Sequence, residues 1–166
     1  MLSMYDASIP PLKRILNNLS AVLKLAQDHV EAKKIDPAVL ISARLFPDMF
    51  PLSRQVQIAS DSSKGAAARL AGLEIPKYED NETTFADLQA RIAKTIAFLD
   101  SIKPEQLEGS ENREIAITAG ERKLTFTGEQ YLLIWVNPNV YFHVTTAYDI
   151  LRHNGVPLSK RDYLGG

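Results

Sequence analysis

The fold is decided by one stretch near the end of the chain, Thr127–Gly155, which reads TGEQYLLIWVNPNVYFHVTTAYDILRHNG. At its start, a threonine and a glutamine three residues later form a capping box, in which the two side chains bond free backbone N–H groups. The Asn-Gly pair at its end is a helix stop. A proline inside a helix lacks a donor and clashes with the preceding turn. We therefore predict a helix over Tyr131–Val136, a kink, and a second helix over Pro138–His153.

Three further helices are predicted upstream, where apolar residues recur every three or four positions. They are expected at about 10–32, 48–71 and 84–102, with a minor helix at 37–45. The first is expected to begin at Pro10, because proline suits the first turn of a helix. Each long helix has one apolar stripe, and a four-helix bundle is the simplest way to bury four such stripes.

A change of period before the last helix predicts a β-hairpin. Ile115 and Ile117, and then Leu124 and Phe126, alternate with polar residues around the turn sequence Ala-Gly-Glu. An isolated two-stranded hairpin is only marginally stable in water. We therefore expect this hairpin to pack on the helices.

The composition indicates one globular domain, residues 1–166, with 45% hydrophobic residues. The net charge is -1, from 19 basic and 20 acidic residues. We therefore expect no nucleic-acid partner. The chain has no cysteine, which excludes disulfides, thiolate catalysis and cysteine zinc sites. Asp6 and two prolines interrupt the region where a signal peptide needs an apolar run, and no stretch is apolar enough to span a membrane. We expect a cytoplasmic protein with no membrane partner.

Two segments carry a resemblance to a known family. They are residues 43–72, ARLFPDMFPLSRQVQIASDSSKGAAARLAG, and residues 137–165, NPNVYFHVTTAYDILRHNGVPLSKRDYLG. With the hairpin between them, they resemble an uncharacterised family of the DinB/YfiT-like superfamily. The resemblance implies a mainly α four-helix bundle with an up-down-down-up course and a small hairpin before the last helix. It also implies that many relatives are suspected metalloenzymes or thiol-dependent transferases and are often dimeric, so we expect a homodimer.

The resemblance also implies where a metal would bind. In that superfamily, three histidines bind a divalent metal, one on helix two and two spaced four residues apart on helix four. The helix-four pair matches Asn139 and His143 here, and helix two has no histidine. A zinc-like ion takes three or four ligands, which these residues do not supply. We therefore expect no cofactor. The alternative is a mixed divalent-metal site of His143 with His29 and a carboxylate such as Asp61 or Asp149.

A polar row on helix two is the first candidate for a ligand site. Arg54, Gln57, Asp61 and Lys64 recur at steps of three and four, beside the apolar stripe. Such a row is either a solvated face or the polar wall of a pocket that faces His143. We take Gln57 and Asp61 as its candidate pocket residues.

Helix four supplies the remaining candidates. His143 follows two aromatic residues on a helix that is apolar on most sides, so it is either a neutral core histidine or a ligand or acid/base group. Asn137 is expected to cap the broken helix, and Asn139 occupies the first metal position. Tyr141 is a core or interface aromatic and also a candidate for the pocket.

These observations lead to three hypotheses. The first is a DinB-like bundle without the full histidine triad, which binds a small molecule or a second copy of itself between helices two and four. The second is a divalent-metal-dependent transferase or hydrolase that uses His143 with non-histidine ligands. The third is a structural stress-response dimer without a pocket.

Overall fold

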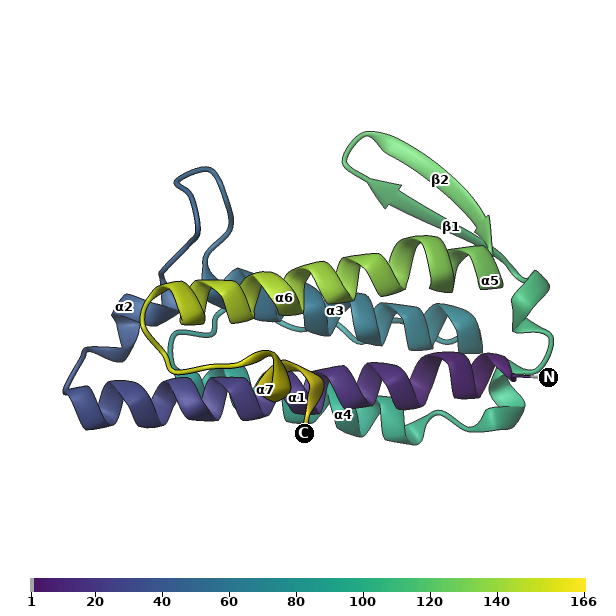
Figure 1. Ribbon diagram of the computed structural model, residues 1–166. Helices are drawn as coiled ribbons and strands as arrows, with labels where there is room; N and C mark the ends of the chain where they lie inside the picture. The colour runs from purple at the N-terminus through teal and green to yellow at the C-terminus, as the bar shows by residue number, and fades with distance from the viewer. Residues whose placement is uncertain (1) are drawn as a thin grey trace.

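The structure, a computed structural model, describes residues 2–166 and is mainly helical (Figure 1). The long helices are α1 (Met4–Lys33), α3 (Leu52–Ala71), α4 (Phe85–Ser101) and α6 (Asn137–His153). The shorter elements are α2 (Pro37–Ile41), η1 (Pro104–Leu107), η2 (Ser110–Asn112), β1 (Glu114–Ala119), β2 (Arg122–Thr127), α5 (Gly128–Gln130), η3 (Tyr131–Val136) and α7 (Lys160–Leu164).

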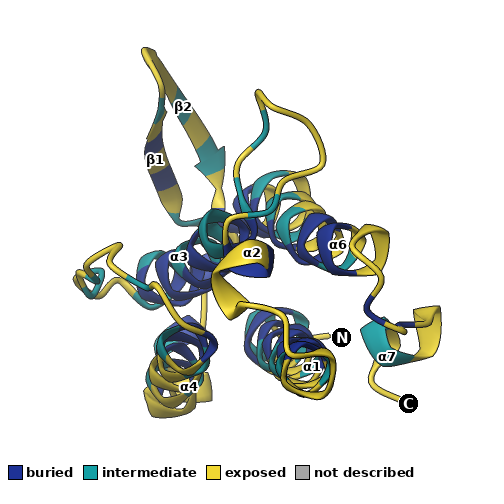
Figure 2. Cartoon of the chain, turned by 90° about the vertical axis from the view of Figure 1, so that its left-hand side faces the viewer, coloured by how far each residue is buried: buried dark blue, intermediate teal, exposed yellow. Residues whose placement is uncertain are grey.

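The four long helices follow the predicted up-down-down-up course. α1 and α6 run parallel to each other, and α3 and α4 run in the opposite direction (Figure 1). Seen along the bundle, α3 packs against α6 and α4, and α1 completes the ring between α4 and α6 (Figure 2). The stripes predicted from the sequence form the core between them, with Leu16, Val56, Leu88 and Val144 among the buried residues. The predicted bundle is confirmed.

The first helix begins earlier than predicted, at Met4 rather than near Pro10. The side chain of Ser3 caps it by accepting a hydrogen bond from the backbone N–H of Asp6. Pro10 and Pro11 therefore lie inside the helix, where each removes one backbone donor. The neighbouring side chains of Ile9 and Leu12 are almost fully buried. This burial offsets the missing hydrogen bonds.

The second long helix begins later than predicted, at Leu52 rather than near Asp48. Pro51 is its N-cap residue, with an extended backbone. A proline disfavours helical geometry at the residue before it, so Phe50 cannot join the helix. The minor helix α2 also ends early, at Ile41. Residues 42–51 form a loop that rises above α6 in Figure 1.

Small residues fill most of the second half of α3. Ser60, Ser63, Gly65 and Ala66–Ala68 are all buried. Short side chains let neighbouring helices approach closely, as the sequence indicated. α3 consequently occupies the middle of the bundle and contacts all three other long helices.

The predicted hairpin is confirmed. β1 and β2 pair antiparallel, with Ile115 opposite Phe126 and Ile117 opposite Leu124. Ile115 and Ile117 are buried, and the ring centroid of Phe126 lies 6.1 Å from that of Trp135 on η3. The hairpin leans over one end of the α3–α6 pair (Figure 1).

The helix is not interrupted at the kink predicted near Pro138. The chain stays helical from α5 through η3 into α6, and η3 is a π-helical turn directly before the proline. In this turn the N–H of Asn137 bonds the carbonyl of Leu132, five residues back. The wider turn accommodates the proline ring, which would otherwise clash with the preceding turn of a regular helix.

The C-terminal segment packs back onto the bundle through α7. Tyr163 makes an edge contact with Tyr148 of α6, and its carbonyl accepts a hydrogen bond from Asn18 of α1. Across residues 2–166, no helix has the length and apolar character needed to cross a membrane.

Candidate functional site

His143 projects from α6 toward α3 and contacts Gln55, which was not among the candidate residues. Its Nδ1 lies 2.7 Å from Oε1 of Gln55. The side-chain nitrogen of Gln55 donates to the carbonyl of Phe50 at 3.0 Å. Because this bond identifies the amide nitrogen of Gln55, its amide oxygen must face the ring and accept a hydrogen bond from the Nδ1–H group of His143. His143 is therefore the tautomer that carries its hydrogen on Nδ1 and a lone pair on Nε2.

The surroundings of His143 favour its neutral form. Partial burial lowers the pKa of His143 below its ordinary value, and the positive charge of Arg54 lowers the pKa further. The ring is half-buried and makes an edge contact with the ring of Phe142. Near neutral pH it therefore presents a hydrogen-bond acceptor on the α3–α6 face.

The two helix-four positions that the resemblance matches to metal ligands hold one amide, Asn139, and one imidazole, His143. Gln55 faces His143 from α3, and Asn139 lies one turn before His143 on α6. The side chain of Asn139 turns back and donates to the carbonyl of Trp135 at 2.6 Å. Asn139, and not Asn137, therefore bonds the backbone near the proline, which corrects the predicted cap. The helix does not break there, so no free end needs capping.

These residues do not fit a divalent metal. Gln55 and Asn139 offer only neutral amides, and both are used in other hydrogen bonds. Nowhere in residues 2–166 do three side chains of the histidine, cysteine, aspartate or glutamate type come together as a possible metal site. His29 and Asp149 join no such group, and Asp61 is bound to Lys64 and Arg91.

Gln57 and Asp61 lie on α3 as predicted, but they face α4 and the segment before it rather than His143. The amide of Gln57 donates to Glu82 at 2.8 Å. Asp61 forms ion pairs with Lys64 at 2.5 Å and with Arg91 at 2.8 Å. The polar contacts of Gln57 and Asp61 are therefore made on the α4 side of α3, and neither residue bonds His143. Asp61 also lines a separate pocket beside η3, which is described below.

Arg91 is the centre of this charged cluster. Its side chain is only 2% exposed and pairs with Asp61, Asp80 and Glu82 at 2.8, 3.0 and 2.8 Å. It also donates to the carbonyl of Glu79 at 3.0 Å. These contacts fasten the connecting segment 77–83 onto α3 and α4.

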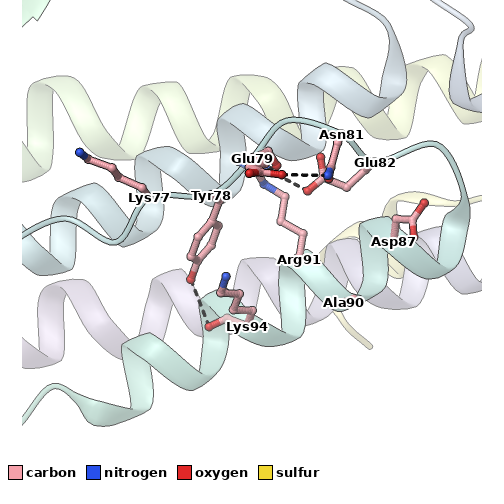
Figure 3. Close-up of a pocket in the computed structure, with 9 residues that line it drawn as sticks. All are labelled: Lys77, Tyr78, Glu79, Asn81, Glu82, Asp87, Ala90, Arg91 and Lys94. Atoms are coloured by element: carbon pink, nitrogen blue, oxygen red, sulfur yellow. Dashed lines mark hydrogen bonds and ion pairs between the residues drawn. The ribbon is translucent and has the colours of Figure 1, made fainter.

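A pocket of about 500 Å³ lies beside this cluster. Figure 3 shows Arg91 directed toward Glu79 and Glu82, and Lys94 beside the ring of Tyr78. The ammonium groups of Lys64 and Lys94 lie 4.4 and 4.2 Å from the centroid of that ring. Because the central charges are paired within the cluster, we assign it a structural role.

Tyr141 lies on the opposite side of α6 from His143. It lines a shallow pocket with Ile15, Tyr163 and Leu164, between α1, α6 and α7. It does not share a site with His143, Gln57 or Asp61. The five candidate residues are therefore distributed over three separate places on the bundle.

The α3–α6 face does contain a pocket, at the end that the hairpin covers. This hairpin pocket has a volume of about 190 Å³. α3 supplies its floor, the strand β1 its roof, and the π-helical turn η3 its wall. The lining residues are Asp61, Ser62, Arg69, Ile117, Thr118, Tyr131, Trp135 and Val136.

Two polar groups stand out in the hairpin pocket. Arg69 donates from Nη1 to the hydroxyl of Tyr131 at 2.9 Å. Tyr131 is 2% exposed, and burial raises the pKa of its phenol, while Arg69 acts against that rise. The phenol therefore stays protonated at neutral pH and can donate its own hydrogen.

Gly65 explains how Arg69 reaches this place. A Cβ on Gly65 would lie 2.7 Å from Nη1 of Arg69. The missing side chain thus leaves room for the guanidinium group to lie back along α3 toward Tyr131. The sequence carries a weak signal for this site, since Gly65 and Arg69, and likewise Tyr131 and Trp135, are spaced by one helical turn.

Comparison with known proteins agrees with this fold. The family model described as "Domain of unknown function (DUF1993)" matches residues 4–164. No curated protein matches the chain. Among solved structures, the chain is similar to a DinB family member protein from Shewanella denitrificans. The two are 40% identical, the match covers 98% of this chain and 92% of that chain, and the TM-score is 0.89.

Proposed function

This chain belongs to the DUF1993 family of DinB-like four-helix bundles, and we propose that it binds a small organic molecule without a metal. The proposed site is the hairpin pocket on the α3–α6 face. One observation carries the proposal: a buried phenol and a guanidinium group meet at a cavity walled by three different parts of the chain. Convergent polar groups in a partly apolar cavity are typical of ligand sites.

His143 extends the same face toward the other end of α3. Its Nε2 is an acceptor in a half-buried position, held in orientation by Gln55. A neutral imidazole held this way suits a hydrogen bond from a hydroxyl or amide group of a ligand. His143 does not line the hairpin pocket, so we propose it as a separate polar contact point on this face.

The alternative is a divalent-metal-dependent transferase or hydrolase that uses His143 with non-histidine ligands. It is less well supported, because Gln55 and Asn139 replace the ligands that such a metal prefers. Elemental analysis of the protein purified without chelator, beside His143→Ala, tests the alternative. We expect no stoichiometric transition metal in either protein. One equivalent in the parent that is lost in the variant would restore the metalloenzyme hypothesis.

We also propose that the protein self-associates through the outer face of α6. Ile134 and Phe142 are 64% and 56% exposed, and the exposed Pro138 lies midway between them at four-residue spacing, on the same side of the helix. Exposed apolar stripes of this kind mark interaction surfaces. Sedimentation analysis should find a dimer that the double variant Ile134→Gln, Phe142→Gln converts to monomer. A parent that sediments as a monomer at high concentration contradicts this proposal.

The ligand proposal is tested by filling the pocket. Ser62→Phe places a ring in the cavity, whereas Ala21→Phe adds the same ring to the exposed face of α1. A fragment library of small acids, amides, amines and alcohols is screened by ligand-observed NMR against the parent and both variants. We expect fragments that bind the parent and Ala21→Phe but not Ser62→Phe. Equal binding to all three proteins, or none to the parent, would refute a ligand site in the hairpin pocket.

A further inference from the structure

We infer that the ligand of the hairpin pocket is a small organic monocarboxylate, held by Arg69 and Tyr131. This inference rests on the proposed function and adds the chemical class of the ligand. It follows from the charge balance of the lining, the hydrogen bonds that are left open, and the size of the cavity.

The charge balance favours an anion. The lining has two charged side chains, Asp61 and Arg69. Asp61 is already paired with two cations, Lys64 and Arg91. Arg69 forms no ion pair with any carboxylate in residues 2–166. The unmatched charge that faces the cavity is therefore positive.

The open hydrogen bonds also call for an acceptor. The Tyr131 hydroxyl uses its oxygen to accept from Arg69, and this is its one hydrogen bond within the described chain. Its own hydrogen is left to donate. A guanidinium group and a neighbouring hydroxyl match the two oxygens of one carboxylate, because charge-assisted donors bind carboxylates strongly. Ser62 and Thr118 add hydroxyl groups to the same lining.

The size and the remaining walls restrict the ligand further. A volume of about 190 Å³ corresponds to about six water molecules, at roughly 30 Å³ each. Ile117, Trp135 and Val136 supply apolar walls. The cavity therefore suits a carboxylate with a short apolar chain or one ring, and excludes nucleotides and long lipids.

The experiment uses Trp135 as the reporter, because it is the one tryptophan in the sequence. Its indole N–H signal in a ¹H–¹⁵N spectrum is unambiguous. The probes are propionate and benzoate, their neutral isosteres propionamide and benzamide, and inorganic phosphate. We expect saturable shifts of this signal with the carboxylates and none with the amides.

Three variants and one control test whether Arg69 and Tyr131 bind the carboxylate. Arg69→Gln removes the charge, and Tyr131→Phe removes only the hydroxyl. Gly65→Ala keeps the charge but forces the guanidinium group away from its place. Each should weaken carboxylate binding at least about tenfold, as loss of a charge-assisted hydrogen bond does. The control Arg152→Gln, an exposed charge on α6, should bind like the parent.

The outcomes distinguish a wrong ligand class from a wrong proposed function. Amides that bind as well as carboxylates, or phosphate that binds in their place, would overturn the ligand class and leave the proposed function standing. Carboxylate binding that survives Arg69→Gln and Gly65→Ala would also overturn it. No shift of the Trp135 signal with any carboxylate overturns the inference, while the pocket-filling experiment decides independently whether the pocket binds a different class.

Discussion

Replacing Arg91 by methionine should destabilise the protein more than any other single loss of charge. The guanidinium group is 2% exposed and contacts the carboxylates of Asp61, Asp80 and Glu82. Breaking a buried ion pair by removing one partner costs about 3–5 kcal/mol, because the other charge stays buried. Glu82 is 8% exposed and would be left in that state, whereas Asp61 and Asp80 are 38% and 40% exposed and can hydrate. We therefore expect the lower end, about 3 kcal/mol.

Urea unfolding followed by far-ultraviolet circular dichroism measures this loss. With a urea dependence of about 2 kcal/mol per molar, a loss of about 3 kcal/mol lowers the midpoint by about 1.5 M. The matched control is Lys24→Met, which breaks a pair whose side chains are 62% and 51% exposed. Such surface pairs contribute about 0.5 kcal/mol or less.

A further variant separates the stranded charge from the lost packing. Adding Glu82→Gln to Arg91→Met removes the buried charge that the single variant leaves behind. The double variant should therefore be more stable than Arg91→Met alone. If Arg91→Met lowered the midpoint no more than Lys24→Met, the assignment of the cluster as the fastening of segment 77–83 would be wrong.

Three more outcomes are expected from the packing and the titration of the bundle. Ala59→Leu should lower the free energy of unfolding by about 1–3 kcal/mol, because Ala59 is fully buried on the close-packed α3. Thermal unfolding identical to that of the parent would contradict this expectation. Gly128→Ala should lower the melting temperature far more than Gly120→Ala, because its Cβ would lie 1.9 Å from the carbonyl oxygen of Ser110. A Cβ on Gly120 meets nothing within 4 Å, so that variant bears only the backbone strain of a φ of 60°, about 1 kcal/mol. The lowered pKa of His143 means that the unfolded chain takes up its proton at a higher pH than the folded chain. The contribution of neutral His143 to the free energy of unfolding is therefore complete above the ordinary histidine pKa of about 6.5, and it is lost as the pH falls below that value. The urea midpoint should therefore fall less between about pH 7.5 and 5 in His143→Gln than in the parent. An equal fall in both proteins would mean that the His143 ring is fully hydrated in the folded chain.

The sequence was sufficient for the helices and the hairpin, because their periodicity follows directly from burial. It was less informative where prolines occur. Pro10 lies inside α1 and Pro138 follows a π-helical turn, although both were expected to mark a boundary or a break. Local proline chemistry favours an end, but the buried residues on either side favour continuing the helix. The balance depends on tertiary packing, which a single sequence does not show.

The candidate site was harder to predict because it depends on helix rotation. Gln55 and Gln57 are two residues apart on α3, yet one bonds His143 and the other bonds Glu82. A polar row reveals that a helix has a polar side but not which neighbour that side faces. The hairpin pocket was missed because its walls come from α3, β1 and η3, which lie far apart in the sequence. His143 was left open between a core histidine and a ligand group, because the sequence does not show that Gln55 faces it.

The order of the helices has a consequence for how the pocket comes into being. α6 packs on α3 and α1, and both partners precede it in the chain by long intervals. Because distant contacts close large loops, we expect them to form after local pairs such as that of α3 and α4. The hairpin and η3 belong to the same late segment. A molecule that binds in the hairpin pocket would therefore recognise only the completely folded chain. Its binding free energy would stabilise that state against partly folded chains in which α6 has not yet packed.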